Sequence, residues 1–231
     1  MPWRKKDVQV IERCSGVAGE IQLQKRGDEY EIIYNGLFLM ATYNGTSEKE
    51  AVARAIEVVR LKSDEPIRVL MGGLGVGFSL RKALDYQVVC EVVISELEPV
   101  IIKWNQNYFG EINGCALGDQ RVTVVNKDFR DVLKEEAKKV EYKRKQGFHV
   151  IMVDTDNGSS WLSLPANSFF YEPEGLELIK RTLNPAGAAG FWCASREKAF
   201  EDCLKKMFSE VSFHTVVEKT GQEGCYYIAV N

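Results

Sequence analysis

Three glycines and a glutamate in the first half of the chain have the spacing of a nucleoside-binding site. Gly73, Gly75 and Gly77 follow the apolar run 67–71, and Glu96 follows the next apolar run, about twenty residues further on. Glycine has no Cβ, so the backbone can turn sharply there and a ligand can lie against it. The glutamate is then placed to accept hydrogen bonds from the hydroxyls of a ribose. The pattern predicts a pocket for an adenosine-containing ligand.

Two aspartates continue this series of acids. Asp128 follows an expected strand at 122–125, and Asp154 follows one at 148–153. Taken singly, Asp128 is a good N-cap for the next helix, and Asp154 could cap the segment after it. Taken together with Glu96, they would line one crevice at the carboxyl ends of neighbouring parallel strands. Clustered carboxylates are costly unless a cation enters, which favours a sulfonium nucleoside or an amine as ligand.

The order of the acids suggests a role for each. Glu96 would bind the ribose, Asp128 would accept a hydrogen bond from the adenine amine, and Asp154 would lie closest to the sulfur. Asp154 could also act as general base towards an attacking amine. Glu98 is expected at the surface or behind Glu96. The polar segment 155–168 could be a closing lid or an exposed connection.

The elements that must position these residues alternate along the chain. Continuous apolar strands alternate with helices from residue 67 onwards, as expected for a parallel sheet covered on both faces. We expect strands at 67–71, 91–95, 122–125, 148–153, 187–193, 211–217 and 224–230. We expect helices at about 77–86, 99–108, 129–145, 171–183 and 196–208. The last two strands are separated only by a short turn, which predicts an antiparallel hairpin.

The residues before this pattern predict a small unit of β-structure. Residues 8–43 contain alternating polar and apolar runs, with turn signals such as Asn35-Gly36 between them. They predict two to four antiparallel strands. Ser47 and Glu50 then have the spacing of a capping box at the start of a helix.

Together these elements predict an α/β fold in two parts. We expect a small N-terminal β-hairpin domain over residues 1–46. A class I methyltransferase-like Rossmann domain, mostly parallel with a C-terminal antiparallel hairpin, would cover residues 47–231. The terminal hairpin and the acid series fit a sulfonium nucleoside better than a dinucleotide, so a nicotinamide enzyme is less favoured.

Composition argues against several partners. The net charge of -3 gives no reason to expect nucleic acid or an anionic membrane. No apolar stretch approaches the ~20 residues needed to cross a bilayer, and the N-terminus lacks the apolar core of a signal peptide. Six scattered cysteines and two histidines predict reduced thiols in a cytoplasmic protein and no metal site.

These residues, in this order, resemble the spermidine synthase (polyamine aminopropyltransferase) family from about residue 19 to the end of the chain. The run 71–77 lies where the family has its Gly-Gly-Gly-Asp-Gly-Gly turn, and 96–101 resembles its Glu-Ile-Asp-x-x-Val. Asp154 falls on the aspartate that begins its Asp-Ser-x-Asp-Pro loop, and 168–171 resembles its later Phe-Tyr.

The resemblance implies transfer of an aminopropyl group from decarboxylated S-adenosylmethionine to a diamine, a small-molecule amine, by a protein that commonly forms homodimers. The site residues that it implies are the donor-binding Gly73, Gly75, Gly77, Glu96 and Asp128, the catalytic Asp154, and the substrate-binding Asp156 and Tyr171.

The departures from the family pattern concern mainly the amine site. The aspartate of the family's glycine turn is Gly75 here, and the histidine of its Tyr-His-Glu segment is Lys49. A glutamine expected near Leu39 is apolar, and the loop after Asp154 lacks the Asp-Pro pair. The nucleoside half of the site is therefore better preserved than the diamine half, and we expect the second substrate to differ.

Two other functions fit the same residues. An S-adenosylmethionine-dependent methyltransferase would use the same scaffold, because a donor with an intact carboxylate would prefer fewer acids in the glycine turn. A non-catalytic homologue that binds a nucleoside, or serves as a scaffold, would explain the lost amine contacts. A preference for S-adenosylmethionine over its decarboxylated form would select the methyltransferase. Failure of every adenosine ligand to raise the melting temperature would favour the non-catalytic homologue.

Overall fold

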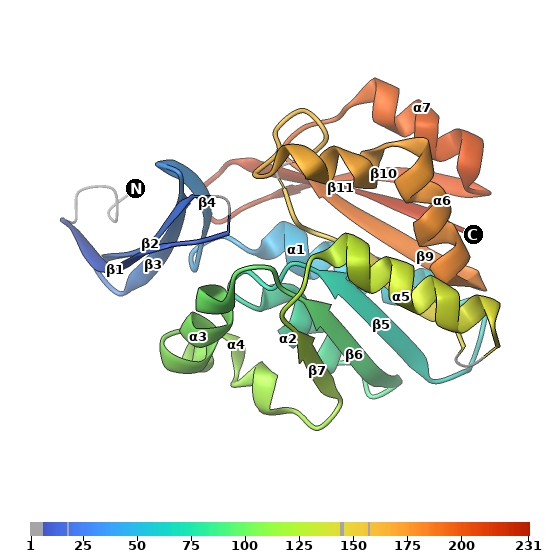
Figure 1. Cartoon of the computed structure of the whole chain (residues 1–231), viewed down its shortest axis with the longest axis horizontal. Helices are drawn as coiled ribbons and strands as arrows, with labels where there is room; N and C mark the ends of the chain where they lie inside the picture. The colour runs from blue at the N-terminus through green and yellow to red at the C-terminus, as the bar shows by residue number, and fades with distance from the viewer. Residues whose placement is uncertain (1–6, 18, 144–145, 157) are drawn as a thin grey trace.

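A computed structural model of the protein describes residues 7–17, 19–143, 146–156 and 158–231. This part of the chain forms a small and a large β-sheet. Figure 1 shows the small sheet, in blue, beside one end of the larger one. It is antiparallel, with strands in sequence order: β1 (Val8–Ser15), β2 (Glu20–Arg26), β3 (Glu29–Tyr34) and β4 (Leu37–Ala41). The prediction of two to four antiparallel strands is confirmed.

The large sheet has the order β10-β11-β9-β8-β5-β6-β7. Strands β5 to β9 are parallel to one another, whereas β11 lies antiparallel to both β9 and β10. The strands are β5 (Ile67–Gly72), β6 (Val89–Ser95), β7 (Val122–Val125), β8 (Phe148–Val153), β9 (Leu183–Cys193), β10 (Glu210–Val217) and β11 (Glu223–Val230). The predicted fold class and the terminal antiparallel hairpin are confirmed.

Helices cover both faces of the large sheet. They are α1 (Thr46–Arg60), α2 (Phe78–Leu84), α3 (Pro99–Asn107), α4 (Gly110–Asn113), α5 (Phe129–Glu141), α6 (Pro173–Thr182) and α7 (Lys198–Met207), with short 3₁₀ helices η2 (Ala116–Gly118) and η3 (Pro165–Tyr171). The helix expected from residue 171 begins at Pro173, because proline favours the first helical turn. The one-turn elements α4 and η2 are too short to show a helical period and were not predicted. None of the helices described here has the length and apolar character to span a membrane.

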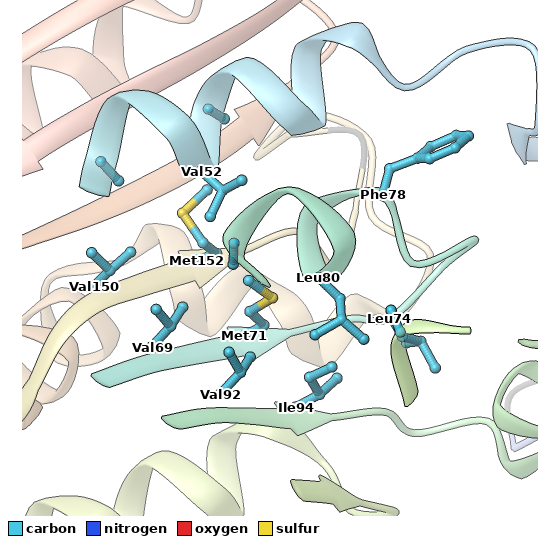
Figure 2. Packing of buried hydrophobic residues seen from close by; sticks show 14 of the residues in the cluster. Val52, Val69, Met71, Leu74, Phe78, Leu80, Val92, Ile94, Val150 and Met152 are labelled. Atoms are coloured by element: carbon cyan, nitrogen blue, oxygen red, sulfur yellow. The ribbon is translucent and has the colours of Figure 1, made fainter. Parts of the chain in front are cut away.

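The core explains why the central strands read as unbroken apolar runs. Val69 and Met71 of β5 belong to one buried cluster, together with Val52 of α1 and Leu80 of α2 (Figure 2). Leu70, between them, belongs to a second cluster beneath α5, α6 and α7. Successive side chains of a strand point to opposite faces, so a strand buried on both faces is apolar at most of its positions.

The start of α1 differs from the sequence prediction. The expected capping box of Ser47 and Glu50 is wrong, because the N-cap is Gly45 and no side chain near it caps the helix. Instead Glu218, from the turn between β10 and β11, accepts hydrogen bonds from the backbone N–H groups of Gly45, Thr46 and Ser47 at 3.1, 3.0 and 2.7 Å. A carboxylate from the far end of the chain thus replaces the local cap.

The small sheet is fixed beside the carboxyl ends of the large sheet by α3. Glu12 of β1 accepts hydrogen bonds from Lys103 Nζ at 2.9 Å and from Trp104 Nε1 at 3.1 Å. These contacts hold β3 and β4 over the strand ends. A division into domains at 1–46 and 47–231 stays our proposal, and residues 1–6 lie outside the described chain.

Candidate functional site

A cavity of about 140 Å³ lies where β5, β6 and β8 end. The chain runs from β5 to β6 on one side and returns to β8 on the other, so the cavity lies at a topological switch point of the sheet. Gly77 and Tyr171 are not among the described residues that line it. Six of the eight residues expected at the site do line it: Gly73, Gly75, Glu96, Asp128, Asp154 and Asp156.

The glycine turn brings backbone against the cavity at two positions where no other residue fits well. Gly73 has a φ of +96°, and a Cβ there would lie 2.2 Å from the carbonyl oxygen of Asp154. Gly75 has a φ of +52°, and a Cβ there would lie 2.3 Å from the Met40 sulfur. Both are left-handed conformations that favour glycine. The turn therefore packs closely against β8 on one side and β4 on the other.

Two buried asparagines hold this turn in place. Asn105 Nδ2 donates to the carbonyl of Gly75 at 2.7 Å, and Asn113 Nδ2 donates to the carbonyl of Val76 at 3.0 Å and to Asn105 Oδ1 at 2.9 Å. Gly77 is the N-cap of α2 and faces these asparagines rather than the cavity. Nothing in the sequence distinguishes the two asparagines from solvated polar residues, so this support was not predicted.

Glu96 lies directly after β6 and is 6% exposed. Its carboxylate accepts hydrogen bonds from the backbone N–H of Leu74, at 2.9 Å, and of Glu98, at 2.8 Å. Burial raises the pKa of Glu96 to about 7, although these N–H groups oppose the rise. A carboxylate can accept about four hydrogen bonds, so Glu96 keeps capacity for ligand hydroxyls.

Asp128 combines the two interpretations that the sequence left open. It caps α5 by accepting a hydrogen bond from the backbone N–H of Arg130 at 2.8 Å, and it also lines the cavity. The Arg130 guanidinium is paired with the same carboxylate, with Nε at 3.0 Å, and holds the pKa of Asp128 below its usual value. A ligand amine at Asp128 would therefore share an oxygen that is already ion-paired.

Asp154 is the least constrained acid of the site. Its backbone N–H donates to the carbonyl of Gly72 at 2.9 Å, which continues the pairing of β8 with β5. Its carboxyl group accepts no hydrogen bond from any described residue. Burial raises the pKa of Asp154 to about 8, and the neighbouring Glu48 and Asp156 add to the rise. Asp154 therefore holds a proton near neutral pH until a cation enters.

Glu48, in the first turn of α1, is a cavity residue that sequence reasoning missed. The Ser47 hydroxyl lies 2.8 Å from Glu48 Oε2 and 2.6 Å from Glu218 Oε1, and it accepts a hydrogen bond from Trp192 Nε1 at 2.9 Å. One hydroxyl has a single proton, so it can donate to only one of these carboxyl groups.

The proton of Ser47 belongs on the Glu218 side. Glu218 accepts three backbone N–H groups and stays ionised, because these bonds and the Ser47 hydroxyl hold its pKa below the usual value against the effect of burial. Any proton on Glu48 is then donated to the Ser47 oxygen. Burial raises the pKa of Glu48. The cavity thus contains a second carboxyl group with a raised pKa near Asp154.

Asp156 organises the segment that follows β8. Its carboxylate accepts hydrogen bonds from the Ser163 N–H at 2.6 Å, the Ser163 hydroxyl at 2.7 Å and Asn167 Nδ2 at 3.1 Å. These bonds close the segment on itself beside the cavity. Whether it opens and closes as a lid stays a prediction, and Asn157 lies outside the described residues.

Tyr171 lies at the end of η3, away from the cavity lining. It is 8% exposed, and its hydroxyl has no hydrogen-bond partner within the described chain. Burial raises its pKa well above the usual value, with further contributions from Asp156 and Asp154. Direct contact between Tyr171 and a ligand would therefore require a change in the cavity wall.

Glu98 is a correction to the sequence analysis. It was expected at the surface or behind Glu96, but it is 5% exposed and lines the cavity. It accepts hydrogen bonds from the Tyr34 hydroxyl at 2.8 Å and from the Val17 N–H at 2.7 Å. Glu98 therefore joins the small sheet to the edge of the large sheet that borders the cavity. No group of three or more potential metal ligands occurs among the described residues.

Most of the chain matches a known sequence domain, and known proteins are similar to it in sequence. The model of the spermine/spermidine synthase domain matches residues 49–221, well over half of the chain. A polyamine aminopropyltransferase of Oceanobacillus iheyensis is 28% identical over 142 residues, covering 57% of this chain and 26% of that protein. One from Prochlorococcus marinus is 25% identical over 181 residues, covering 74% of this chain and 60% of that protein. The chain thus matches less than two thirds of the length of either relative.

Solved structures share the fold over nearly the whole chain. Spermidine synthase from Thermotoga maritima superposes with a TM-score of 0.74 at 18% identity, covering 96% of this chain and 72% of that one. A spermidine synthase in complex with the transition-state analogue AdoDATO gives a TM-score of 0.76 at 18% identity, covering 96% and 73%. At this identity the likeness concerns the fold alone.

Proposed function

Because the chain belongs to the spermine/spermidine synthase domain family, we propose that it is a transferase that alkylates an amine with an S-adenosyl sulfonium donor. Decarboxylated S-adenosylmethionine is the donor that we favour. The observation that carries the proposal is the meeting of Glu96, Asp128 and Asp154 with the glycine turn in one cavity. Two relatives are named polyamine aminopropyltransferase, which supports the same class of reaction.

The donor would lie across the glycine turn. In this proposal Glu96 binds the ribose hydroxyls, and Asp128 contacts the adenine amine while it stays paired with Arg130. The positive sulfonium then lies towards Asp154. Entry of a cation lowers the pKa of a buried carboxyl group, so donor binding would convert Asp154 to the ionised form.

Asp154 would then prepare the acceptor. An amine arrives as an ammonium ion and must lose a proton before its nitrogen can attack. Asp154, with a pKa of about 8 before ligands bind, takes that proton. The nitrogen lone pair forms a bond to the carbon next to sulfur, the carbon–sulfur pair stays on sulfur, and the neutral thioether nucleoside leaves. Positioning and electrostatics supply most of the acceleration.

The acceptor side of the cavity supports an altered second substrate. Asp156 is committed to Ser163 and Asn167, and Tyr171 lies behind the lining. Among the acids near the expected amine position, Asp154 alone has a carboxyl group without a hydrogen-bond partner in the described chain. The Asp154 carboxylate can pair with one ammonium group, so a simple diamine would leave its second ammonium group without an unengaged anionic partner here.

A methyltransferase is the second candidate, and one observation favours it. The Met40 sulfur occupies the space beside Gly75, where the related family carries an aspartate. A donor with an intact carboxylate would meet less repulsion at such a turn. Homodimer formation and a cytoplasmic location belong to our proposal as well, and sedimentation velocity tests the former.

Isothermal titration with decarboxylated S-adenosylmethionine, S-adenosylmethionine and methylthioadenosine tests the proposal, followed by a transfer assay with amines. We expect methylthioadenosine to bind and the decarboxylated donor to bind tighter than S-adenosylmethionine. The reverse preference selects the methyltransferase. Failure of all three to bind or to raise the melting temperature would leave a scaffold protein.

A further inference from the structure

A second, smaller cavity adjoins the candidate site. Its volume is about 60 Å³, and it shares the lining residues Tyr34, Leu39 and Ser163 with the larger cavity. The rest of its wall comes from the hairpin between β3 and β4 and from the segment after β8, which contribute Leu37, Phe38, Trp161 and Leu162 with Asn35. The two cavities therefore form one continuous depression between the small sheet and that segment.

The smaller cavity is apolar and open. None of its described lining residues carries a charge. Leu37, Phe38 and Trp161 are 53%, 41% and 42% exposed, although all three line the same cavity. Such exposure is unusual for large apolar side chains that lie together. Grouped exposed apolar side chains of this kind mark binding surfaces in soluble proteins. Their continuity with the candidate site indicates that the same ligand reaches both.

The charge pattern along the depression defines the ligand. Asp154 lies near the donor's expected sulfur, and the carboxyl groups of Glu48 and Glu98 in the larger cavity already have hydrogen-bond partners. The described lining of the smaller cavity carries no charge. A second ammonium group placed in the smaller cavity would lose part of its hydration and gain no anionic partner from that lining, which is costly. An apolar group placed there would instead remove exposed apolar surface from water.

We propose that the acceptor is an amine with an apolar or aromatic substituent, and that this substituent occupies the smaller cavity against Trp161 and Phe38. The inference rests on the proposed function, because the larger cavity is taken to hold the donor and the reacting nitrogen. It names an amphipathic monoamine, rather than a linear diamine, as the class of second substrate.

A matched pair of ligands tests the inference. The terminal methyl group of n-hexylamine replaces one ammonium group of 1,5-diaminopentane at nearly the same length. Each amine is titrated calorimetrically into the full chain, with and without saturating methylthioadenosine. We expect n-hexylamine to bind at least about tenfold tighter, since burying apolar area gains roughly 25 cal/mol per Å².

Three variants test whether the substituent of the amine lies in the smaller cavity. Trp161→Ala should weaken n-hexylamine binding about tenfold and leave 1,5-diaminopentane unchanged, by loss of apolar contact area. Trp161→Phe should keep most of the affinity. Leu61→Ala removes another exposed apolar side chain, 86% exposed at the end of α1, and should change neither. Trp161 is itself well exposed, so its loss is not expected to prevent folding.

The outcomes separate the inference from the proposed function. If methylthioadenosine binds but the diamine binds as tightly as n-hexylamine, the inference is overturned and the transferase stands. If methylthioadenosine does not bind, the transferase falls, and the inference, which rests on it, falls with it. A Trp161→Ala variant that dissociates a dimer and leaves amine affinity unchanged would make this surface a subunit contact and overturn the inference.

Discussion

The thioether sulfur of Met40 accepts a hydrogen bond from the backbone N–H of Val76, over a distance of 3.1 Å. This contact places a side chain of the small sheet directly on the glycine turn of the large one. A Cβ on Gly75 would lie 2.3 Å from the same sulfur. Met40 therefore fills the space that a side chain at position 75 would need, and substitutions at these two positions should not be independent.

We expect Gly75→Asp alone to lower the free energy of unfolding by about 2 kcal/mol or more, because it adds a steric clash and places a residue with a Cβ at a left-handed φ. Met40→Ala should cost less, since Met40 is only partly buried. The double variant should recover at least about 1 kcal/mol of the summed cost, the size of coupling expected for residues in contact. Urea unfolding of the four proteins measures this, and strictly additive losses would contradict it.

Asp154→Asn should stabilise the protein at alkaline pH. The pKa of Asp154 is about 8 in the folded state and about 3.8 when unperturbed. Between these values the folded protein retains a proton that the unfolded chain releases, so this group lowers stability as pH rises. Asparagine removes the effect. The gain at pH 8 should be on the order of 1 kcal/mol or more, and should shrink towards pH 5.

The same variant should lose turnover and keep nucleoside affinity if Asp154 is the base. Asp156→Asn is the matched control two residues further along the segment. It should lower stability at both pH values, because its carboxylate accepts bonds from Ser163 and Asn167. Calorimetric melting at pH 5 and pH 8, with titration of methylthioadenosine, distinguishes the two. Equal loss of nucleoside affinity and turnover in Asp154→Asn would make Asp154 a binding residue instead.

Glu48→Gln should lower the pKa of Asp154. Glu48 contributes to raising that pKa, whereas a glutamine cannot become anionic and can still donate to the Ser47 oxygen. The pH at which kcat/KM reaches half of its alkaline plateau reports the base in the free enzyme. It should therefore move to lower pH in the variant, with stability nearly unchanged. An unchanged midpoint would show that the two carboxyl groups do not interact.

Much of this architecture was predictable because it follows from local pattern. The apolar runs ending at Gly72 and Val153 lie in strands buried on both faces, and such strands cannot alternate with polar residues. Parallel strands place their carboxyl ends at one edge. The position of Glu96 and Asp154 in a single cavity therefore follows from order along the chain once the fold is known.

The contacts that were missed join residues far apart in sequence. Met40 reaches the glycine turn from β4, Glu98 binds Tyr34 of the small sheet, and Glu218 caps a helix near the other end of the chain. No periodicity encodes such pairs, because each depends on how two finished elements pack. Ser47 illustrates the point: it has the residue type of an N-cap, but a distant carboxylate supplies the cap.

Glu218→Ala should destabilise the protein by about 2–3 kcal/mol, more than the usual loss of a local cap. The substitution leaves three backbone N–H groups at the start of α1 without their acceptor, and it removes the partner of the Ser47 hydroxyl.

Glu223→Ala is the matched control, since Glu223 lies at the start of β11 and is exposed. Urea unfolding should separate the two variants, and hydrogen exchange should show faster exchange at residues 46–48 only in Glu218→Ala. The freed Ser47 proton can then reach Glu48, so the pH profile of turnover should shift as well. Equal, small losses of stability in both variants would mean that water satisfies the helix start and that the cap from the terminal hairpin is dispensable.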